Sequence, residues 1–219
     1  MKKNIVLFIL FILPIVAYLF FATGVNSFMT LPVLTKNVNE LGNWKTLNDE
    51  KVVLKDKITI LGFGGNSILS QKGTYFNLNQ KIYNKNKAFK DFQFVTIVPI
   101  GCEKQVEELV SKLEELNSID NWHFVFAKPD EIQNLYTSLK LKETIKTDLS
   151  AKNVFIIDKK LNLRGRKAKT FVGSNKNDYK EGYDAASPSD LYNEMADDVK
   201  VILAEYRLAL KRNNAKRQI

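Results

Sequence analysis

The chain of 219 residues is long enough for one domain with attachments, and its 45% share of hydrophobic residues is enough for a buried core. Its net charge of +9 would suit an anionic membrane surface, but no RNA-binding, zinc-ligand or helix-turn-helix pattern accompanies it, which argues against a nucleic-acid partner. One cysteine, Cys102, and one histidine, His123, exclude an intrachain disulfide and make a poor metal site, so we expect no cofactor.

The N-terminal segment carries no charged side chain from Ile5 to Val25. At about 1.5 Å per residue, a helix of that length crosses a bilayer. Lys2 and Lys3 favour a cytoplasmic N-terminus. We therefore predict a membrane anchor over residues 1–25, with a single pass through the cytoplasmic membrane and the domain on the extracytoplasmic, or periplasmic, side. A cleaved signal peptide is the alternative, although its apolar core is usually shorter, at about 7–15 residues.

Residues 26–57 have no strong periodicity and are predicted to be a juxtamembrane connector, with a possible extended strand over 29–34. A regular alternation follows. Apolar, β-branched runs predict strands over 57–63, 92–100 and 122–126. Apolar residues spaced three and four apart predict helices over 75–89, 104–116 and 129–139.

The C-terminal part is expected to close the sheet. Residues 153–158 and 161–166 are predicted to pair as a hairpin, followed by a loop over 167–184. Ser187 is an N-cap before a proline and predicts a last helix over 188–212, with a basic tail over 213–219. The order predicts one domain over 58–212, an α/β, thioredoxin-like fold with a mixed central sheet flanked by helices.

Three segments, ITILGFGGNSILS (58–70), NWHFVFAKPDEIQNLYTSL (121–139) and TDLSAKNVFIIDKKLNLRGR (147–166), carry a family resemblance. They look like the strand and Cys-Pro-x-x-Cys loop, the tryptophan strand with its helix, and the Asp-His-Ser segment of the Sco family. Sco proteins are membrane-anchored thioredoxin-fold proteins that handle copper during cytochrome c oxidase assembly. The resemblance spans about residues 58 to 205 and also implies the thioredoxin-like fold.

The family's copper ligands are missing from the matching positions. Its two cysteines fall at about Asn66 and Ser70, and its histidine falls at Leu149. Thiolates allow such a site to select Cu(I), and asparagine, serine and leucine do not replace them. The resemblance therefore implies a pseudo-active site, with the fold retained and the copper and disulfide chemistry lost.

Two further residues, the single cysteine and the single histidine, are candidates outside this vacant site. Cys102 lies near the start of a predicted helix, where a thiol pKa can fall, so it is a weak redox candidate; a small, semi-buried structural residue is the favoured interpretation. His123 lies inside an apolar strand and is interpreted as a structural residue of the sheet.

These observations predict a non-catalytic, Sco-like protein that acts as an accessory subunit or assembly factor of a membrane complex; the family resemblance alone points to a respiratory oxidase as that complex. Its expected partners are the bilayer and a membrane protein, without copper. Two alternatives stay open: a single-thiol redox protein that uses Cys102, and a binder of a ligand other than copper at the vacant site. Basic residues near the predicted hairpin and the C-terminus could contact lipid head groups.

Overall fold

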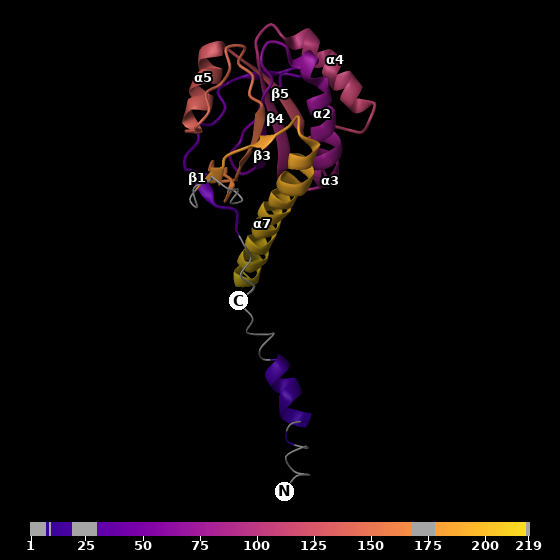
Figure 1. The fold of residues 1–219 in the computed structure, drawn as a ribbon, viewed down its shortest axis with the longest axis vertical. Helices are drawn as coiled ribbons and strands as arrows, with labels where there is room; N and C mark the ends of the chain where they lie inside the picture. The colour runs from indigo at the N-terminus through magenta and orange to yellow at the C-terminus, as the bar shows by residue number, and fades with distance from the viewer. Residues whose placement is uncertain (1–7, 9, 19–29, 168–177, 218–219) are drawn as a thin grey trace.

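The computed structural model describes residues 8, 10–18, 30–167 and 178–217, with side chains in the last helix up to residue 209. A mixed sheet with the order β1-β7-β6-β3-β4-β5-β2 forms its centre (Figure 1). The parallel strands β3 (Ile58–Phe63), β4 (Phe92–Pro99) and β5 (Trp122–Ala127) are joined by β6 (Asn153–Ile157), which pairs antiparallel to β3. The predicted thioredoxin-like architecture with a mixed sheet is confirmed.

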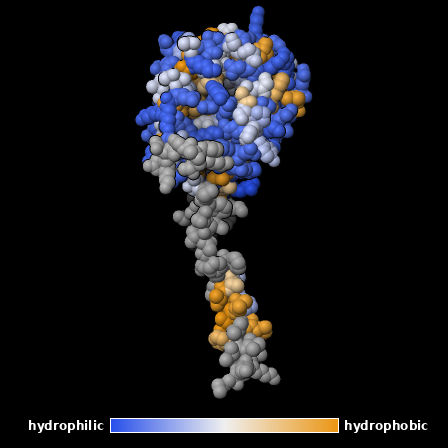
Figure 2. All heavy atoms as spheres, viewed as in Figure 1, coloured by the Kyte–Doolittle hydropathy of each residue, from blue (hydrophilic) through white to orange (hydrophobic). Residues whose placement is uncertain are grey.

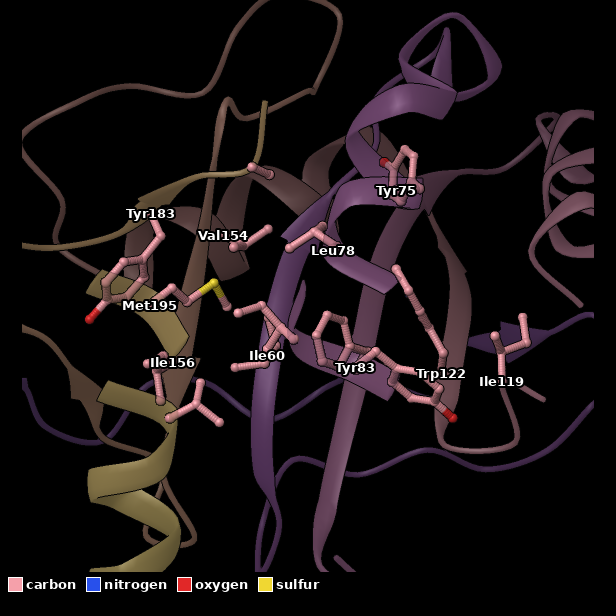
Figure 3. Close-up of a cluster of buried hydrophobic side chains, with 14 of the residues drawn as sticks. Ile60, Tyr75, Leu78, Tyr83, Ile119, Trp122, Val154, Ile156, Tyr183 and Met195 are labelled. Carbon is pink, nitrogen blue, oxygen red and sulfur yellow. The ribbon is translucent and has the colours of Figure 1, made fainter. Parts of the chain in front are cut away.

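Two hydrophobic clusters cover the two faces of this sheet. Along β3, Ile58 and Ile60 belong to one cluster, whereas Leu61 and Phe63 belong to the other, as expected when successive side chains of a strand point to opposite faces. The first cluster contains the aromatic contact of Tyr83 with Trp122 (Figure 3). Both faces are covered, so every residue of β3 and β4 is buried, which explains why their sequences show little polar alternation.

The helices lie close to their predicted positions. On the face of the first cluster lie consecutive helical turns: η1 (Ile68–Gln71), α2 (Lys72–Leu78), η2 (Asn79–Tyr83) and α3 (Asn84–Asn86). They begin seven residues before the start of the helix predicted over 75–89. Helix α4 (Glu103–Glu114) packs on the same face. On the opposite face lies α5 (Pro129–Ser138). The chain closes with α6 (Pro188–Asp190), η3 (Leu191–Met195) and α7 (Ala196–Arg217), and Ser187 Oγ accepts from the Asp190 amide as the predicted N-cap.

The segment predicted as a connector is part of the folded domain. Strand β1 (Val33–Thr35) pairs with β7 (Leu163–Arg164), and β2 (Lys45–Thr46) pairs with β5 at the other edge of the sheet. Leu31 and Leu54 are buried. The predicted boundary at residue 58 is therefore too late, because the domain already begins at about Leu31. The extended strand predicted over 29–34 overlaps β1 at Val33 and Leu34, whereas β2, with two residues, carries too little periodicity to be recognised.

Arg164 ties this entry segment to the end of the chain. Its guanidinium is buried, with Nη1 2.9 Å from Asp158 Oδ2 and Nη2 2.7 Å from Glu205 Oε2. Its Nε donates to the carbonyl oxygen of Leu31 at 2.8 Å. One side chain thus connects the start of the domain, the β6–β7 hairpin and helix α7. The antiparallel pairing of β6 with β7 confirms the predicted hairpin.

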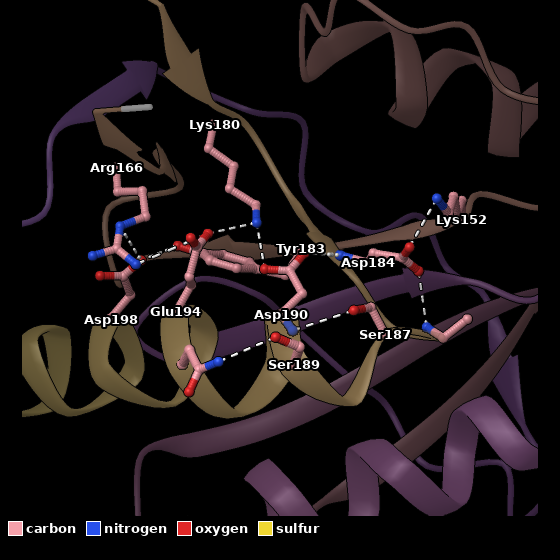
Figure 4. A network of polar contacts seen from close by, with 12 residues as sticks. Lys152, Arg166, Lys180, Tyr183, Asp184, Ser187, Ser189, Asp190, Glu194 and Asp198 are labelled. Atoms are coloured by element: carbon pink, nitrogen blue, oxygen red, sulfur yellow. Dashed lines mark hydrogen bonds and ion pairs between the residues drawn. The ribbon is translucent and has the colours of Figure 1, made fainter. Parts of the chain in front are cut away.

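The region predicted as a loop over 167–184 contains short strands. Strands β8 (Arg166–Lys167) and β9 (Tyr179–Lys180) pair with one another, and β10 (Tyr183–Asp184) pairs with β6; residues 168–177 of the predicted loop lie outside the described residues. Figure 4 shows how this region is held to the C-terminal helix: Lys180 binds both Asp190 and Glu194.

A second contact in Figure 4 buries a carboxylate. The Tyr183 hydroxyl donates to Asp198 Oδ2 at 2.6 Å, and Arg166 Nε lies 3.5 Å from the same oxygen. Burial nevertheless raises the pKa of Asp198. The free energy that the charged carboxylate loses on leaving water therefore exceeds the free energy that these two partners return to it.

The predicted anchor lies only partly within the described residues. Residues 10–18 are helical and expose apolar side chains such as Leu10 and Phe11, seen in orange in Figure 2. Residues 1–7, 9 and 19–25 of the predicted span, and the side chains of the predicted basic tail, lie outside the described part. Within the described part, no helix has the length and apolar character needed to cross a membrane.

Candidate functional site

The loop that follows β3 is attached to the segment 148–150. Gly64 forms an antiparallel bridge with Ser150, and the Asn66 amide donates to the Asp148 carbonyl oxygen at 2.9 Å. Gly65 has a φ of +66°, and a Cβ there would lie 2.7 Å from the Asp148 carbonyl oxygen. Glycine is required at this position for its conformation and for the close approach of the two segments. The structure thus brings together the two segments that the family resemblance assigns to one site.

The second segment forms a tight turn of its own. Asp148 Oδ1 accepts from the Ser150 amide at 3.0 Å and from Ser150 Oγ at 2.7 Å. The hydrogen bond from the Ser150 hydroxyl is the main reason that the pKa of Asp148 is lowered, because it favours the charged carboxylate. Leu149, between them, is half-buried and has a φ of +62°. Among residues other than glycine, Asn, Asp and His are enriched in this conformation, so the backbone would suit the histidine that the resemblance places here.

The two loop residues that the resemblance assigns to the family's cysteine positions, Asn66 and Ser70, are both exposed. Asn66 precedes the first helical turn, and Ser70 lies within it, with its hydroxyl donating to the Ser67 carbonyl oxygen at 2.7 Å. Neither side chain provides a sulfur ligand. The hollow beside this junction, lined by Phe63, Gln71 and Ala151 among others, has a volume of about 20 Å³. That is room for about one water molecule, which does not favour a ligand site there.

Cys102, which the sequence offered only as a separate redox candidate, contacts the vacant loop in the structure. It precedes α4, and its Sγ lies 3.6 Å from the Asn66 carbonyl oxygen. Gln105 Nε2 donates to the same oxygen at 3.0 Å. The start of α4 therefore holds the vacant loop from a third direction. No local signal in the sequence connects residues 66 and 102, because the contact depends on the pairing of β3 with β4.

The environment of Cys102 does not favour a reactive thiolate. Only 7% of the residue is exposed, and burial raises the pKa of its thiol, with a further contribution from the Glu103 carboxylate. Both effects oppose the lowering of the pKa that a helix N-terminus would give. The single-thiol alternative needs an exposed sulfur of low pKa, whereas the structure shows a small buried residue that packs against the core.

His123 takes no part in the vacant site. It lies on β5, and its Nδ1 is 4.0 Å from Glu50 Oε2. Burial lowers the pKa of the imidazole despite this carboxylate, so the ring is neutral near pH 7. Within the described ranges, no three His, Cys, Asp or Glu side chains are grouped so that they could hold a metal ion.

These features define the class of protein: a thioredoxin-fold domain in which the loop after the first central strand has no thiol pair and is attached to residues 148–150. No protein-family model and no curated protein matches the chain. Among solved structures, the chain is similar to BsSco, a member of the Sco family of cytochrome c oxidase assembly proteins, with a TM-score of 0.55 and 15% identity over 80% of this chain and 98% of that one.

Two further structures share the fold. One is a SCO1/SenC family lipoprotein from Bacillus anthracis str. Ames, with a TM-score of 0.55 and 12% identity over 81% of this chain and 99% of that one. The other is a putative electron transfer protein from Aquifex aeolicus VF5, with a TM-score of 0.52 and 17% identity over 77% and 92%. The structural neighbours of the chain are thus Sco proteins and other thioredoxin-fold proteins, and at these identities the similarity establishes the fold.

Proposed function

We propose that this protein is a membrane-anchored, extracytoplasmic, Sco-like protein with no copper or thiol chemistry of its own, which acts as an accessory subunit or assembly factor of a membrane complex. The bilayer would hold it through residues 1–25, and a membrane protein would be its partner. A respiratory oxidase is the complex that the Sco neighbours suggest, because BsSco belongs to a family of cytochrome c oxidase assembly proteins.

The observation that carries this proposal is the arrangement of the vacant loop. Asn66, Ser70 and Leu149 are the residues that the family resemblance assigns to the three ligand positions, and the backbone around them is held in place by Gly64–Ser150 pairing and by the hydrogen bond from residue 66 to residue 148. A loop that keeps its fold without its reactive groups supports a role in which the domain surface, and not the loop chemistry, is used.

The test is gentle detergent extraction of the native, tagged chain, with identification of co-purifying proteins and a copper assay on the same sample. We expect a stoichiometric membrane-protein partner and no copper bound to this chain. A matched Cys102→Ser variant distinguishes the proposal from the single-thiol alternative. If the thiol has no role, the variant should retain the same partner in the same amount. A solitary protein that carries copper, or loss of the partner in Cys102→Ser, would contradict the proposal.

A further inference from the structure

A long hollow follows one side of α4, and we call it the α4 groove. Its first part, about 540 Å³, is bordered by residues 43–47, by the turn after β4 and by the first turns of α4 and α5. Its second part, about 470 Å³, continues between residues 46–50, the end of α4 and β5. Thr46 and Leu47 line both parts, so the two hollows adjoin each other along the β2 edge of the sheet.

The floor of the α4 groove is apolar and aromatic. Ile100 is 57% exposed, and Trp44 and Leu47 are half-buried beside it. Phe126 and, in the second part, Trp122 lie at the base. An exposed isoleucine beside partly covered aromatic side chains provides apolar surface that a partner could remove from water.

The rim has the opposite charge to the rest of the chain. Among the described residues, six carboxylates line the groove, whereas the chain as a whole has a net charge of +9; these are Glu50, Glu103, Glu107, Glu114, Asp120 and Glu131. Two lysines, Lys45 and Lys128, also line the groove. Lys45 Nζ lies 3.2 Å from Asp49 Oδ1, which offsets its charge. The lining therefore presents an excess of negative charge around an apolar floor.

We propose that the α4 groove binds a basic segment of a partner polypeptide whose cationic side chains alternate with apolar ones. The apolar side chains would cover Ile100 and Trp44, and the cationic ones would meet the glutamates of α4. Strand β2, whose outer edge pairs with no other strand in the described sheet, would guide an extended segment along the same direction. This inference rests on the proposed interaction role and states the chemistry of the surface that performs it.

The direct test uses the two tryptophans, Trp44 and Trp122, which are the only two of the chain and both line the groove. The full-length protein in nonionic detergent is titrated with a ten-residue peptide of alternating lysine and valine, and tryptophan fluorescence is followed. Two matched peptides replace lysine by glutamate or valine by serine. We expect a saturable change with the first peptide, at least tenfold weaker binding of the other two, and weaker binding as salt is raised.

Two matched charge reversals on α4 give the control. Glu107→Lys with Glu114→Lys changes the groove rim, whereas Glu108→Lys with Glu115→Lys makes the same charge change, at the same seven-residue spacing, on residues outside the groove lining. The first pair should weaken peptide binding at least tenfold, and the second should change it less than threefold. Ile100→Ser should also weaken peptide binding. Its control is Leu116→Ser, which should not weaken binding, because Leu116 is an exposed residue of the same size outside the groove lining.

Several results would overturn the inference: no saturable change, equal binding of the acidic peptide, equal loss in both charge-reversed pairs, or a concentration-dependent self-association that accounts for the fluorescence change. The proposed function is judged separately by co-purification. If the membrane partner co-purifies equally with both charge-reversed pairs, the groove assignment fails and the interaction role stands; if the protein is solitary and carries copper, the interaction role itself fails.

Discussion

The contact between the vacant loop and residues 148–150 predicts a large effect of the substitution Gly65→Ala. A residue other than glycine in the left-handed conformation costs about 1–2 kcal/mol. The added Cβ would also lie 2.7 Å from the Asp148 carbonyl oxygen and 2.9 Å from the Ser150 amide nitrogen, which are backbone atoms held by the Gly64–Ser150 bridge. Displacing them raises the expected loss of unfolding free energy to about 3 kcal/mol, within the range for strained backbone positions.

The measurement is thermal unfolding of the full-length chain, followed by circular dichroism in the same detergent for each variant. For a chain of this size, about 3 kcal/mol corresponds to a fall in Tm of about 6–12 °C. Gly73→Ala is the matched control: it lies in α2, and a Cβ there meets no atom within 4 Å. It should stabilise the protein by about 0.5–1 kcal/mol. A loss at residue 65 of about 1 kcal/mol or less would refute the packing of the loop against 148–150.

Three further predictions follow from the site and its surroundings. Cys102 should react with iodoacetamide at pH 8 at least tenfold more slowly than it does in denaturant, since the thiol is buried with a raised pKa; equal rates would contradict this. The triple variant Asn66→Cys, Ser70→Cys, Leu149→His should gain Cu(I) binding in competition with a Cu(I) chelator, whereas Leu149→His alone should not. Asp198, whose folded pKa is raised, contributes a stability that is full below its unfolded pKa, near 3.9, and is lost as the pH rises through the folded value. Asp198→Asn should therefore gain stability relative to the wild type between pH 4 and neutral pH in denaturant titrations, and a constant difference would contradict the role of burial.

The central part of this fold could be predicted from the sequence because its signals are local. The run 58–63 is apolar enough to mark a buried strand, and α4 and α5 carry helical periodicity; the structure places all three within one or two residues of the prediction. Within the predicted helix over 129–139, the apolar residues Tyr136 and Leu139 are both buried. In these segments, local preference and tertiary burial favour the same conformation.

The parts that could not be predicted depend on contacts between distant residues. Strand β2 has two residues and exists because it pairs with the edge of a sheet formed by later segments; the strand predicted over 29–34 only overlaps β1, whose position is set by its pairing with β7. The same holds for the site. The family resemblance alone assigns residues 66 and 149 to one site, and the contact of Cys102 with the Asn66 carbonyl oxygen requires the registered pairing of β3 and β4.

Arg164 has a mechanical consequence. Its guanidinium binds the carbonyl oxygen of Leu31, where the chain enters the domain, and the carboxylate of Glu205 on the last helix. A pulling force applied through the N-terminal residues would reach this side chain and the hydrogen bonds of β1 with β7 together, and these bonds would resist it in shear along the strand direction. The entry strand, the hairpin and α7 would then share a load on the N-terminal residues, because one guanidinium binds all three.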